Sequence, residues 1–358
     1  MFNIDSDFPE KYFDTNKAII SCCELAQEGD AHARELLLRV FEFGETILET
    51  TEQEDDDEEE NVEEVALTAE WDRILELHTT KNCSIGMMLG KREYYPEAFS
   101  FFKKAAEEKD PVGAFFVGWY FASGKGVVKS KDSALKYYKI AADRGIILAQ
   151  ICYADTILQS IKNSKNAKDM EEKHDAILKY LSIASESGSA IASSKLGEFY
   201  LLQKNSREQA LRYYIIAAEK NDPDALRALG RFYEDGDLLE KSITNAEKCY
   251  LKAAALAEPT AYFELGKLYE ANPALCRHHK VVAAYYYRIG AELEDFRAQY
   301  EIARLYETGD WSFLNISKEH CLEKAIFFYT LAAKSRFCKY ASEYAEACKK
   351  KLSMLTQP

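Results

Sequence analysis

No apolar run in this sequence approaches the ~18 residues that a membrane-spanning helix needs. The N-terminus, MFNIDSDFPEKYFD, is acidic and lacks the basic segment and following apolar stretch of a secretory signal. These two absences argue against membrane insertion and against secretion. We therefore expect a cytoplasmic protein.

Motifs for phosphate or metal binding are also missing in complete form. The Gly-Lys-Gly segment at residues 124–126 has no preceding strand and no full phosphate-loop pattern, so it predicts a turn with positive φ. Cys276, His278 and His279 lie together, but no second Cys/His pair stands at zinc-site spacing. We expect no cofactor, no bound metal and no catalytic residues, with a metal-dependent enzyme at these three residues as an alternative.

An excess of positive charge is absent as well. The formal net charge of −14 and the lack of a continuous basic groove argue against a nucleic-acid partner. Eleven acidic residues lie between Glu49 and Glu64, and Glu54–Glu60 is unbroken. Such a run repels itself and buries nothing, so residues 49–64 are predicted to be a disordered acidic insert.

What the sequence does contain is a repeat, clearest between Gly113 and Gly145. A helical apolar stripe, a glycine-bracketed loop and a second stripe of alanines and tyrosines follow one another there. The alanine that opens the second helix recurs at intervals of 36, 42, 34, 36, 37 and 42 residues, at Ala98, Ala134, Ala176, Ala210, Ala246, Ala283 and Ala325. Such a period is typical of stacked helix pairs.

Two further features recur with the same period. A small or apolar pair follows each opening alanine, including Ala105-Ala106, Ala141-Ala142, Ile183-Ala184 and Ala217-Ala218. The first helix repeats a Leu-Gly or Ile-Ala pair with a tyrosine three residues later, at Leu196-Gly197, Leu229-Gly230, Leu265-Gly266 and Ile302-Ala303. Each unit therefore contributes two helices whose apolar stripes must be buried on neighbouring units.

These residues resemble the Sel1-like repeats, relatives of the tetratricopeptide repeats. The family pattern joins a Leu-Gly-x-Leu-Tyr helix to a Gly-x-Gly-Val loop, an acidic residue and an Ala-x-x-Tyr-Tyr-x-x-Ala-Ala helix; Gly124, Gly126, Val127 and Asp132 match the loop and the acidic position. The resemblance covers about residues 82–335. It implies an α-solenoid that binds other proteins and performs no chemistry of its own.

We predict an all-α fold: a right-handed α-solenoid of about eight helix-pair repeats with capping helices at both ends. Residues 1–48 are assigned to N-terminal capping helices and a first repeat, with helices expected at 16–28, anchored by Ala18, and at 31–43. After the acidic insert, the repeat array is assigned to residues 65–335. The C-terminal capping helix and tail take residues 336–358.

The nine cysteines occupy no recurring repeat position. Secreted Sel1-like proteins carry one disulfide per repeat, and that pattern is absent here. We expect buried or incidental thiols in a reducing compartment.

The resemblance to tetratricopeptide repeats implies that the first helices line a concave face and that the residue after the glycine points toward a partner. At that position stand Lys91, Trp119, Asp155, Glu198, Arg231, Lys267 and Arg304. The C-terminal three are basic, Arg227 lies one turn before Arg231, and the equivalent positions are the aromatic Phe263 and Tyr300. These residues predict a site for a peptide with an acidic segment or a terminal carboxylate.

The alternative interpretation of this basic stripe is a solvated face with local Arg231–Glu234 and Arg304–Glu307 pairs. A second candidate surface is formed by Phe115 and Trp119, for which burial in the core is the alternative.

The leading functional prediction is a non-enzymatic scaffold or adaptor that holds a partner protein or peptide in the groove of the solenoid. One alternative is an effector, secreted by an intracellular bacterium, that acts on host proteins through the same groove. Another is a hydrolase of the kind once proposed for disulfide-rich Sel1-like proteins.

Overall fold

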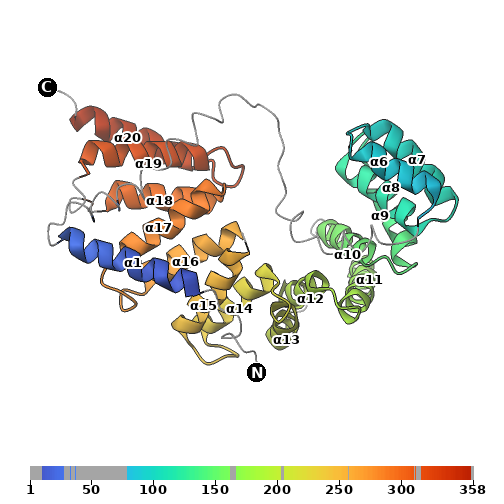
Figure 1. Ribbon diagram of the computed structural model, residues 1–358, viewed down its shortest axis with the longest axis horizontal. Helices are drawn as coiled ribbons and strands as arrows, with labels where there is room; N and C mark the ends of the chain where they lie inside the picture. Colours follow the sequence, from blue (N-terminus) through green and yellow to red (C-terminus); the bar gives the residue numbers. More distant parts are fainter. Residues whose placement is uncertain are drawn as a thin grey trace. The chain divides into compact units, whose positions relative to one another are not determined.

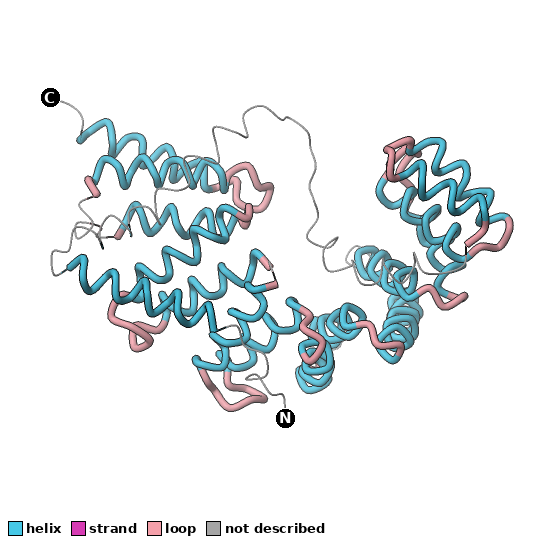
Figure 2. The backbone as a smooth tube through the Cα atoms, in the orientation of Figure 1, coloured by secondary structure: helices cyan, strands magenta, loops and turns pink. Residues whose placement is uncertain are grey.

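The computed structural model describes residues 10–27, 33, 37, 79–161, 167–202, 205–256, 258–309, 311 and 316–355, and within these ranges the chain forms sixteen α-helices and no strand (Figures 1 and 2). The helices are α1 (Glu10–Gln27), α6 (Lys81–Gly90), α7 (Tyr95–Glu107), α8 (Pro111–Ser123), α9 (Lys131–Ala142), α10 (Ile147–Ile161), α11 (Ala167–Glu186), α12 (Ala190–Leu202), α13 (Arg207–Ala218), α14 (Pro223–Asp235), α15 (Ile243–Ala255), α16 (Pro259–Ala271), α17 (His279–Glu292), α18 (Phe296–Thr308), α19 (Lys318–Ala332) and α20 (Ala341–Leu355).

Consecutive helices pack together as pairs, and within each of the two compact units described below one pair packs on the next. α6 pairs with α7, α8 with α9, α10 with α11, α12 with α13, α16 with α17 and α18 with α19, and α20 covers α19. This arrangement confirms the all-α solenoid prediction. The chain divides into two compact units, a middle unit (residues 59–225) and a C-terminal unit (residues 226–358 with 1–58).

Helices α8 and α14 begin at Asp-Pro pairs, a sequence signal for a helix start. Asp110 caps α8 by accepting hydrogen bonds from the backbone N–H groups of Val112 and Gly113, and proline occupies the first position of the helix. Asp222 accepts from the backbone of Ala225 in the same way before α14. Burial raises the pKa of this carboxyl to about 6, although the backbone hydrogen bond opposes that change.

The Gly-x-Gly segment also has the predicted geometry. Gly124 and Gly126 have φ angles of 80° and 68°, where a side chain would be strained. A Cβ atom on Gly126 would lie 2.6 Å from the backbone of Tyr95 and Pro96, so this loop closes directly on the start of α7.

In five of the helix pairs, a glycine of the first helix lies under an aromatic ring of the second. A Cβ atom on Gly118 would come within 2.6 Å of the Tyr138 ring, and one on Gly197 within 2.7 Å of Tyr214. The same contact joins Gly86 to Phe102, Gly230 to Tyr250 and Gly266 to Tyr287. These rings are buried, so the missing side chain lets two helices approach closely enough to bury a tyrosine between them.

Two predicted register assignments are wrong by one residue. In α11 the buried residues are Ile177, Tyr180, Leu181 and Ala184, whereas Ile183 is 40% exposed. The 42-residue interval before this helix shifted the predicted alignment, because the opening position is Ile177 rather than Ala176. In α1 the predicted anchor Ala18 is exposed, and Ile19, Cys23 and Ala26 are buried instead.

The N-terminal helix α1 packs against α17 in the C-terminal unit. It is longer than predicted, while the expected helix at 31–43 is described only at Ala33 and Leu37, both helical and buried. The acidic insert 49–64, nearly all of the expected helix at 65–80 and most of the loop at 163–169 lie outside the described residues. The division of the chain at 48, 64 and 335 therefore stays a prediction.

The glycine contact predicts the result of a one-atom change. Alanine is a better helix former than glycine by about 1 kcal/mol, so propensity alone would make Gly266→Ala stabilising. We expect it instead to lower the free energy of unfolding by about 1–3 kcal/mol, because the added methyl group overlaps the Tyr287 ring. Urea denaturation measures the difference.

The matched control introduces Gly266→Ala into a Tyr287→Leu background, where the ring is gone. There the alanine should cost little or become favourable. A stabilised Gly266→Ala single variant would contradict the close contact.

Candidate functional site

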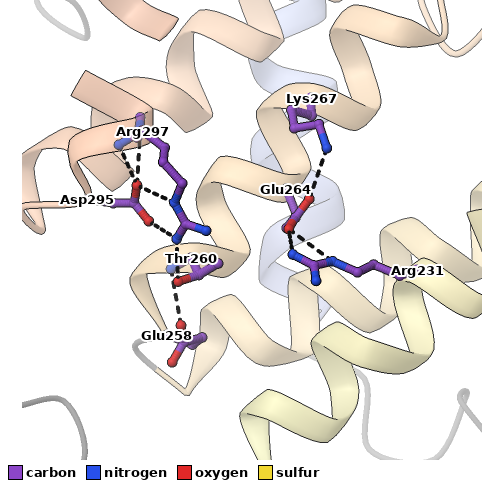
Figure 3. A network of polar contacts seen from close by, with 8 residues as sticks. Arg231, Glu258, Thr260, Glu264, Lys267, Asp295 and Arg297 are labelled. Carbon is purple, nitrogen blue, oxygen red and sulfur yellow. Dashed lines mark hydrogen bonds and ion pairs between the residues drawn. The ribbon is translucent and has the colours of Figure 1, made fainter. Parts of the chain in front are cut away.

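The first helices α14, α16 and α18 carry the basic residues that the sequence singled out. Arg231 of α14 donates two hydrogen bonds from its guanidinium to Glu264 Oε1 of α16 (Figure 3). Lys267, one turn further along α16, lies 3.5 Å from the other oxygen of the same carboxylate. Glu264 is 2% exposed, so a buried negative charge holds both cations.

Arg304 of α18 is paired in a similar way. Its guanidinium donates to Glu270 of α16 at 2.5 and 2.7 Å and to Glu301 on its own helix at 2.6 Å. Glu270 also accepts a 3.1 Å hydrogen bond from the hydroxyl of Tyr287. We call Arg231, Glu264, Lys267, Glu270, Glu301 and Arg304 the charge ladder.

The carboxylate one turn after the glycine position has a recurring partner in the C-terminal unit. It accepts a hydrogen bond from the buried tyrosine of the second helix: Glu234 from Tyr250, Glu270 from Tyr287 and Glu307 from Tyr329. Lys351 of α20 completes the series by donating to Glu307. Each acidic group therefore satisfies a tyrosine hydroxyl that packing would otherwise leave buried without an acceptor.

The residue after the glycine position reaches the next first helix in the chain. Arg231 contacts Glu264, which lies two residues before Gly266, and Asp155 of α10 contacts Lys195 of α12, which lies two residues before Gly197, at 3.1 Å. The two pairs have the same geometry with exchanged charges. These side chains therefore join neighbouring repeats. In the sequence, opposite charges at the residue after one glycine position and two residues before the next glycine indicate this contact.

The predicted basic stripe is accordingly a balanced set of charges. Its three cations face three carboxylates within the charge ladder. The local pairs proposed as the alternative are not the ones formed, because Arg231 pairs with Glu264 instead of Glu234, and Arg304 with Glu270 and Glu301 instead of Glu307. Arg227 is half-buried on α14, and its charge acts on Glu264 as well.

Aromatic side chains lie beside the charge ladder. Phe263 is half-buried, with the guanidinium of Arg297 4.8 Å and the Lys267 ammonium 5.7 Å from its ring centre. The equivalent Tyr300 is half-buried too, and its ring meets Tyr340 at 5.5 Å and Tyr344 at 5.6 Å. Tyr340 is 51% exposed, so this aromatic surface reaches solvent on α20.

Arg297 is held in place over Phe263 by several polar groups. It pairs with Asp295, the cap of α18, and donates to the Thr260 hydroxyl at 2.9 Å (Figure 3). Glu258 in turn accepts from the backbone N–H of Thr260. The cation on the Phe263 ring is therefore fixed by the helix starts of α16 and α18.

The second candidate surface needs a correction. Phe115 is fully buried and packs on Phe116 and Tyr138, so it cannot contact a partner. Trp119 is half-buried at the edge of the same core, and Lys125 lies 5.6 Å from its ring centre. Aromatic residues on a helix that is apolar all round are core residues, as the alternative interpretation held.

Cys276, His278 and His279 do not join with other described residues into a group of three or more metal-ligating side chains. His278 is buried, and its burial, together with the charge of Arg277, lowers the pKa of the imidazole. The loop they occupy lies near Cys23 of α1, whose thiol pKa is raised to about 12 by burial and by neighbouring thiols.

Two nearby carboxyl groups have opposite pKa shifts. Burial would raise the pKa of Glu264, but the Arg231 hydrogen bond and the charges of Arg231, Lys267 and Arg227 bring it below the ordinary value of 4.5. For Glu234, burial outweighs the hydrogen bond from Tyr250, and the pKa is raised above 4.5. Glu264 thus favours folding when ionised, whereas ionised Glu234 costs stability.

The stacked helix pairs place this protein in the class of helix-pair repeat solenoids. Five segments of the chain match the Sel1 repeat, at residues 90–110, 111–146, 190–222, 223–257 and 296–336. The protein is therefore a Sel1-repeat protein. In the residues that the structure describes, no helix combines the length and apolar character needed to cross a membrane.

Among proteins of similar sequence are the DAP3-binding cell death enhancer 1 of Rattus norvegicus and that of Mus musculus. Each is 32% identical over 181 residues, which is 50% of this chain, and the match covers 35% and 34% of the two relatives. The chain thus spans about a third of the length of the curated relatives it matches.

A Sel1 repeat protein from Oxalobacter formigenes is similar in structure, with a TM-score of 0.58 and 26% identity over 70% of this chain and 99% of that one. A protective antigen of uropathogenic Escherichia coli with the SLR fold has a TM-score of 0.52 and 22% identity, over 88% and 64% of the two chains. The second likeness concerns the fold alone.

The opposite pKa shifts lead to opposite effects of the same substitution. Glu264→Gln should lower the free energy of unfolding at pH 7 by about 1–3 kcal/mol, because the buried acceptor of Arg231 loses its charge. Glu234→Gln keeps an acceptor for Tyr250 and removes a charge that burial disfavours, so it should be neutral or stabilising.

Urea denaturation at pH 7 and at pH 4 distinguishes the two variants. The stability that Glu264 supplies is present above pH 4.5 and is lost as the pH falls through its lower folded-state pKa, so the defect of Glu264→Gln should shrink on acidification. Equal losses in both variants at pH 7 would contradict this assignment.

Proposed function

We propose that the protein is a non-enzymatic scaffold that binds a partner protein through the first-helix face of its C-terminal unit. The observation that supports this proposal is the aromatic surface of Phe263, Tyr300 and Tyr340 beside the exposed Lys267. Sel1-repeat solenoids commonly serve as interaction scaffolds, and this face combines apolar area with fixed polar groups, as protein-binding surfaces do.

The charge ladder refines the expected chemistry of the partner. Arg231 and Arg304 are occupied by carboxylates, whereas the side chain of Lys267 is 56% exposed and its contact to Glu264 is a long one at 3.5 Å. A partner segment with one carboxylate at Lys267 and an apolar or aromatic residue between Phe263 and Tyr300 fits this surface better than a uniformly acidic peptide.

DAP3 is the first partner to test, because two relatives are named for binding it. The match covers about a third of those relatives, and we propose that DAP3 binding extends to this protein. The proposal also places the protein in the cytoplasm, since its nine cysteines are free, as a reducing compartment requires.

The sharpest test of the face leaves the hydrogen-bonded Arg231–Glu264 pair intact and changes the half-buried Phe263 and the exposed Lys267. Reversing the charge of Arg231 would place a second carboxylate against buried Glu264 and unfold the site, so it is not a usable binding variant. Phe263→Ala and Lys267→Gln change exposed atoms. Each should weaken DAP3 binding about 5- to 30-fold, or ~1–2 kcal/mol, with an unchanged circular dichroism spectrum.

Lys129→Gln in the middle unit is the matched control, because Lys129 is also exposed but lies outside the face. Isothermal titration calorimetry with purified DAP3 measures all three variants. Unchanged affinity of the Phe263 and Lys267 variants for DAP3 would show that DAP3 does not bind this face. Absence of binding by the unaltered protein would exclude DAP3 and leave the face to be tested with other partners.

A further inference from the structure

A regular pattern of exposed side chains covers the second helices of the middle unit. In α9, α11 and α13 a cation is followed four residues later by isoleucine and three residues after that by a carboxylate. The three sets are Lys136, Ile140 and Asp143; Lys179, Ile183 and Glu186; and Arg212, Ile216 and Glu219. All nine residues are exposed, and the three isoleucines are 39%, 40% and 39% exposed.

Hydrogen bonds join the C-terminal ends of the three helices, so equivalent residues of successive repeats form rows. The hydroxyl of Tyr180 in α11 donates to Asp143 at the end of α9. Lys220 after α13 donates to the backbone carbonyl of Gly188 after α11 at 2.8 Å. The face therefore presents a row of cations, a row of isoleucines and a row of carboxylates, each crossing successive helices.

Packing within the unit does not account for the isoleucines. The tyrosine and alanine stripes of these helices face inward and are buried, as Tyr138 and Tyr214 show. Single exposed apolar residues are common on protein surfaces. The same β-branched residue at one position of three successive repeats, between two rows of opposite charge, is the arrangement of a binding face with a defined orientation.

The C-terminal unit shows that a second helix of this fold can pack against an amphipathic helix. There α1 packs against the second helix α17. α17 buries Val281, Ala284 and Arg288, whereas none of the equivalent residues of α9, which are Asp132, Leu135 and Lys139, is buried. The buried residues of α1, Ile19, Cys23 and Ala26, form one helical stripe. An amphipathic helix thus packs on a second helix in the C-terminal unit, on the strip next to Tyr285, Ile289 and Glu292, the equivalents of Lys136, Ile140 and Asp143.

We propose that the face formed by α9, α11 and α13 binds an amphipathic α-helix of a partner protein. Its apolar stripe lies along the isoleucine row, its acidic flank faces Lys136, Lys179 and Arg212, and its basic flank faces Asp143, Glu186 and Glu219. If the second helices of successive repeats lie roughly 10 Å apart, a partner helix with a rise of ~1.5 Å per residue presents one apolar residue to each isoleucine about every seven residues. This site is separate from the first-helix face described above.

The test uses the full chain and synthetic helical peptides of about 21 residues, or three heptads, labelled for fluorescence anisotropy. The matched peptide has leucines along one stripe, glutamates on one flank and lysines on the other. Two comparison peptides carry lysines on both flanks or glutamates on both flanks. We expect the matched peptide to bind tightest, because only it complements both charged rows, with the preference reduced at high salt.

Two triple variants examine the rows separately. Ile140→Ser with Ile183→Ser and Ile216→Ser should weaken binding of the matched peptide at least about tenfold, while Leu202→Ser, at a residue 61% exposed outside the face, should change it less than about twofold. Lys136→Glu with Lys179→Glu and Arg212→Glu should weaken the matched peptide and make the lysine-flanked peptide the tightest binder. The exposed lysines 81, 91 and 129 changed to glutamate provide the charge-matched control.

The outcomes decide the proposal in either direction. The charge variant alters only exposed residues and so tests the face even if the isoleucine variant does not fold. Unchanged affinity of the matched peptide in folded triple variants, or no preference among the three peptides, would overturn the proposal. A homodimer of the unaltered protein that the isoleucine variant converts to a monomer would assign the face to a second copy of the chain, which also overturns it.

Discussion

The contact between a glycine and an aromatic ring underlies the rest of this structure. In five helix pairs a tyrosine or phenylalanine of the second helix lies against a glycine of the first, where a Cβ atom would overlap the ring. The contact brings the two helices of a pair close together and buries a large ring between them. The hydroxyl then needs an acceptor, and in the C-terminal unit the carboxylate one turn beyond the glycine position provides it. Packing in the pair thus decides where a charge must stand.

The charges follow from that constraint. A carboxylate placed to accept from a buried tyrosine is itself partly buried, and a cation from the next repeat offsets its charge, as Arg304 does for Glu270. Neighbouring repeats are also joined by Arg231 and Glu264, and in the middle unit by Asp155 and Lys195 at the same positions with reversed sign. Cations on such a face therefore connect neighbouring repeats to one another. The half-buried rings and the exposed Lys267, whose contact to Glu264 is long, are available to a partner.

The two units use their second helices differently. In the C-terminal unit α1 packs on α17, and positions that are exposed elsewhere are buried there. In the middle unit a neighbouring strip of α9, α11 and α13 presents isoleucines between two rows of charges. A solenoid thus has two long surfaces, one on each kind of helix, and binding need not be confined to the first-helix face that resemblance to tetratricopeptide repeats brings forward.

The sequence by itself determined the class of fold, the pairing of helices and the helix starts at Pro111 and Pro223, because period, caps and glycine turns are local signals. It also predicted burial as the alternative for Phe115. Which residues meet across repeats was decided only by the tertiary structure. Arg231 lies three residues from Glu234 in the chain, yet it pairs with Glu264 because the next first helix brings that carboxylate beside it. The one-residue shift at Ile183 has a similar cause, since a loop of altered length moves the register and only packing shows which side of α11 faces inward.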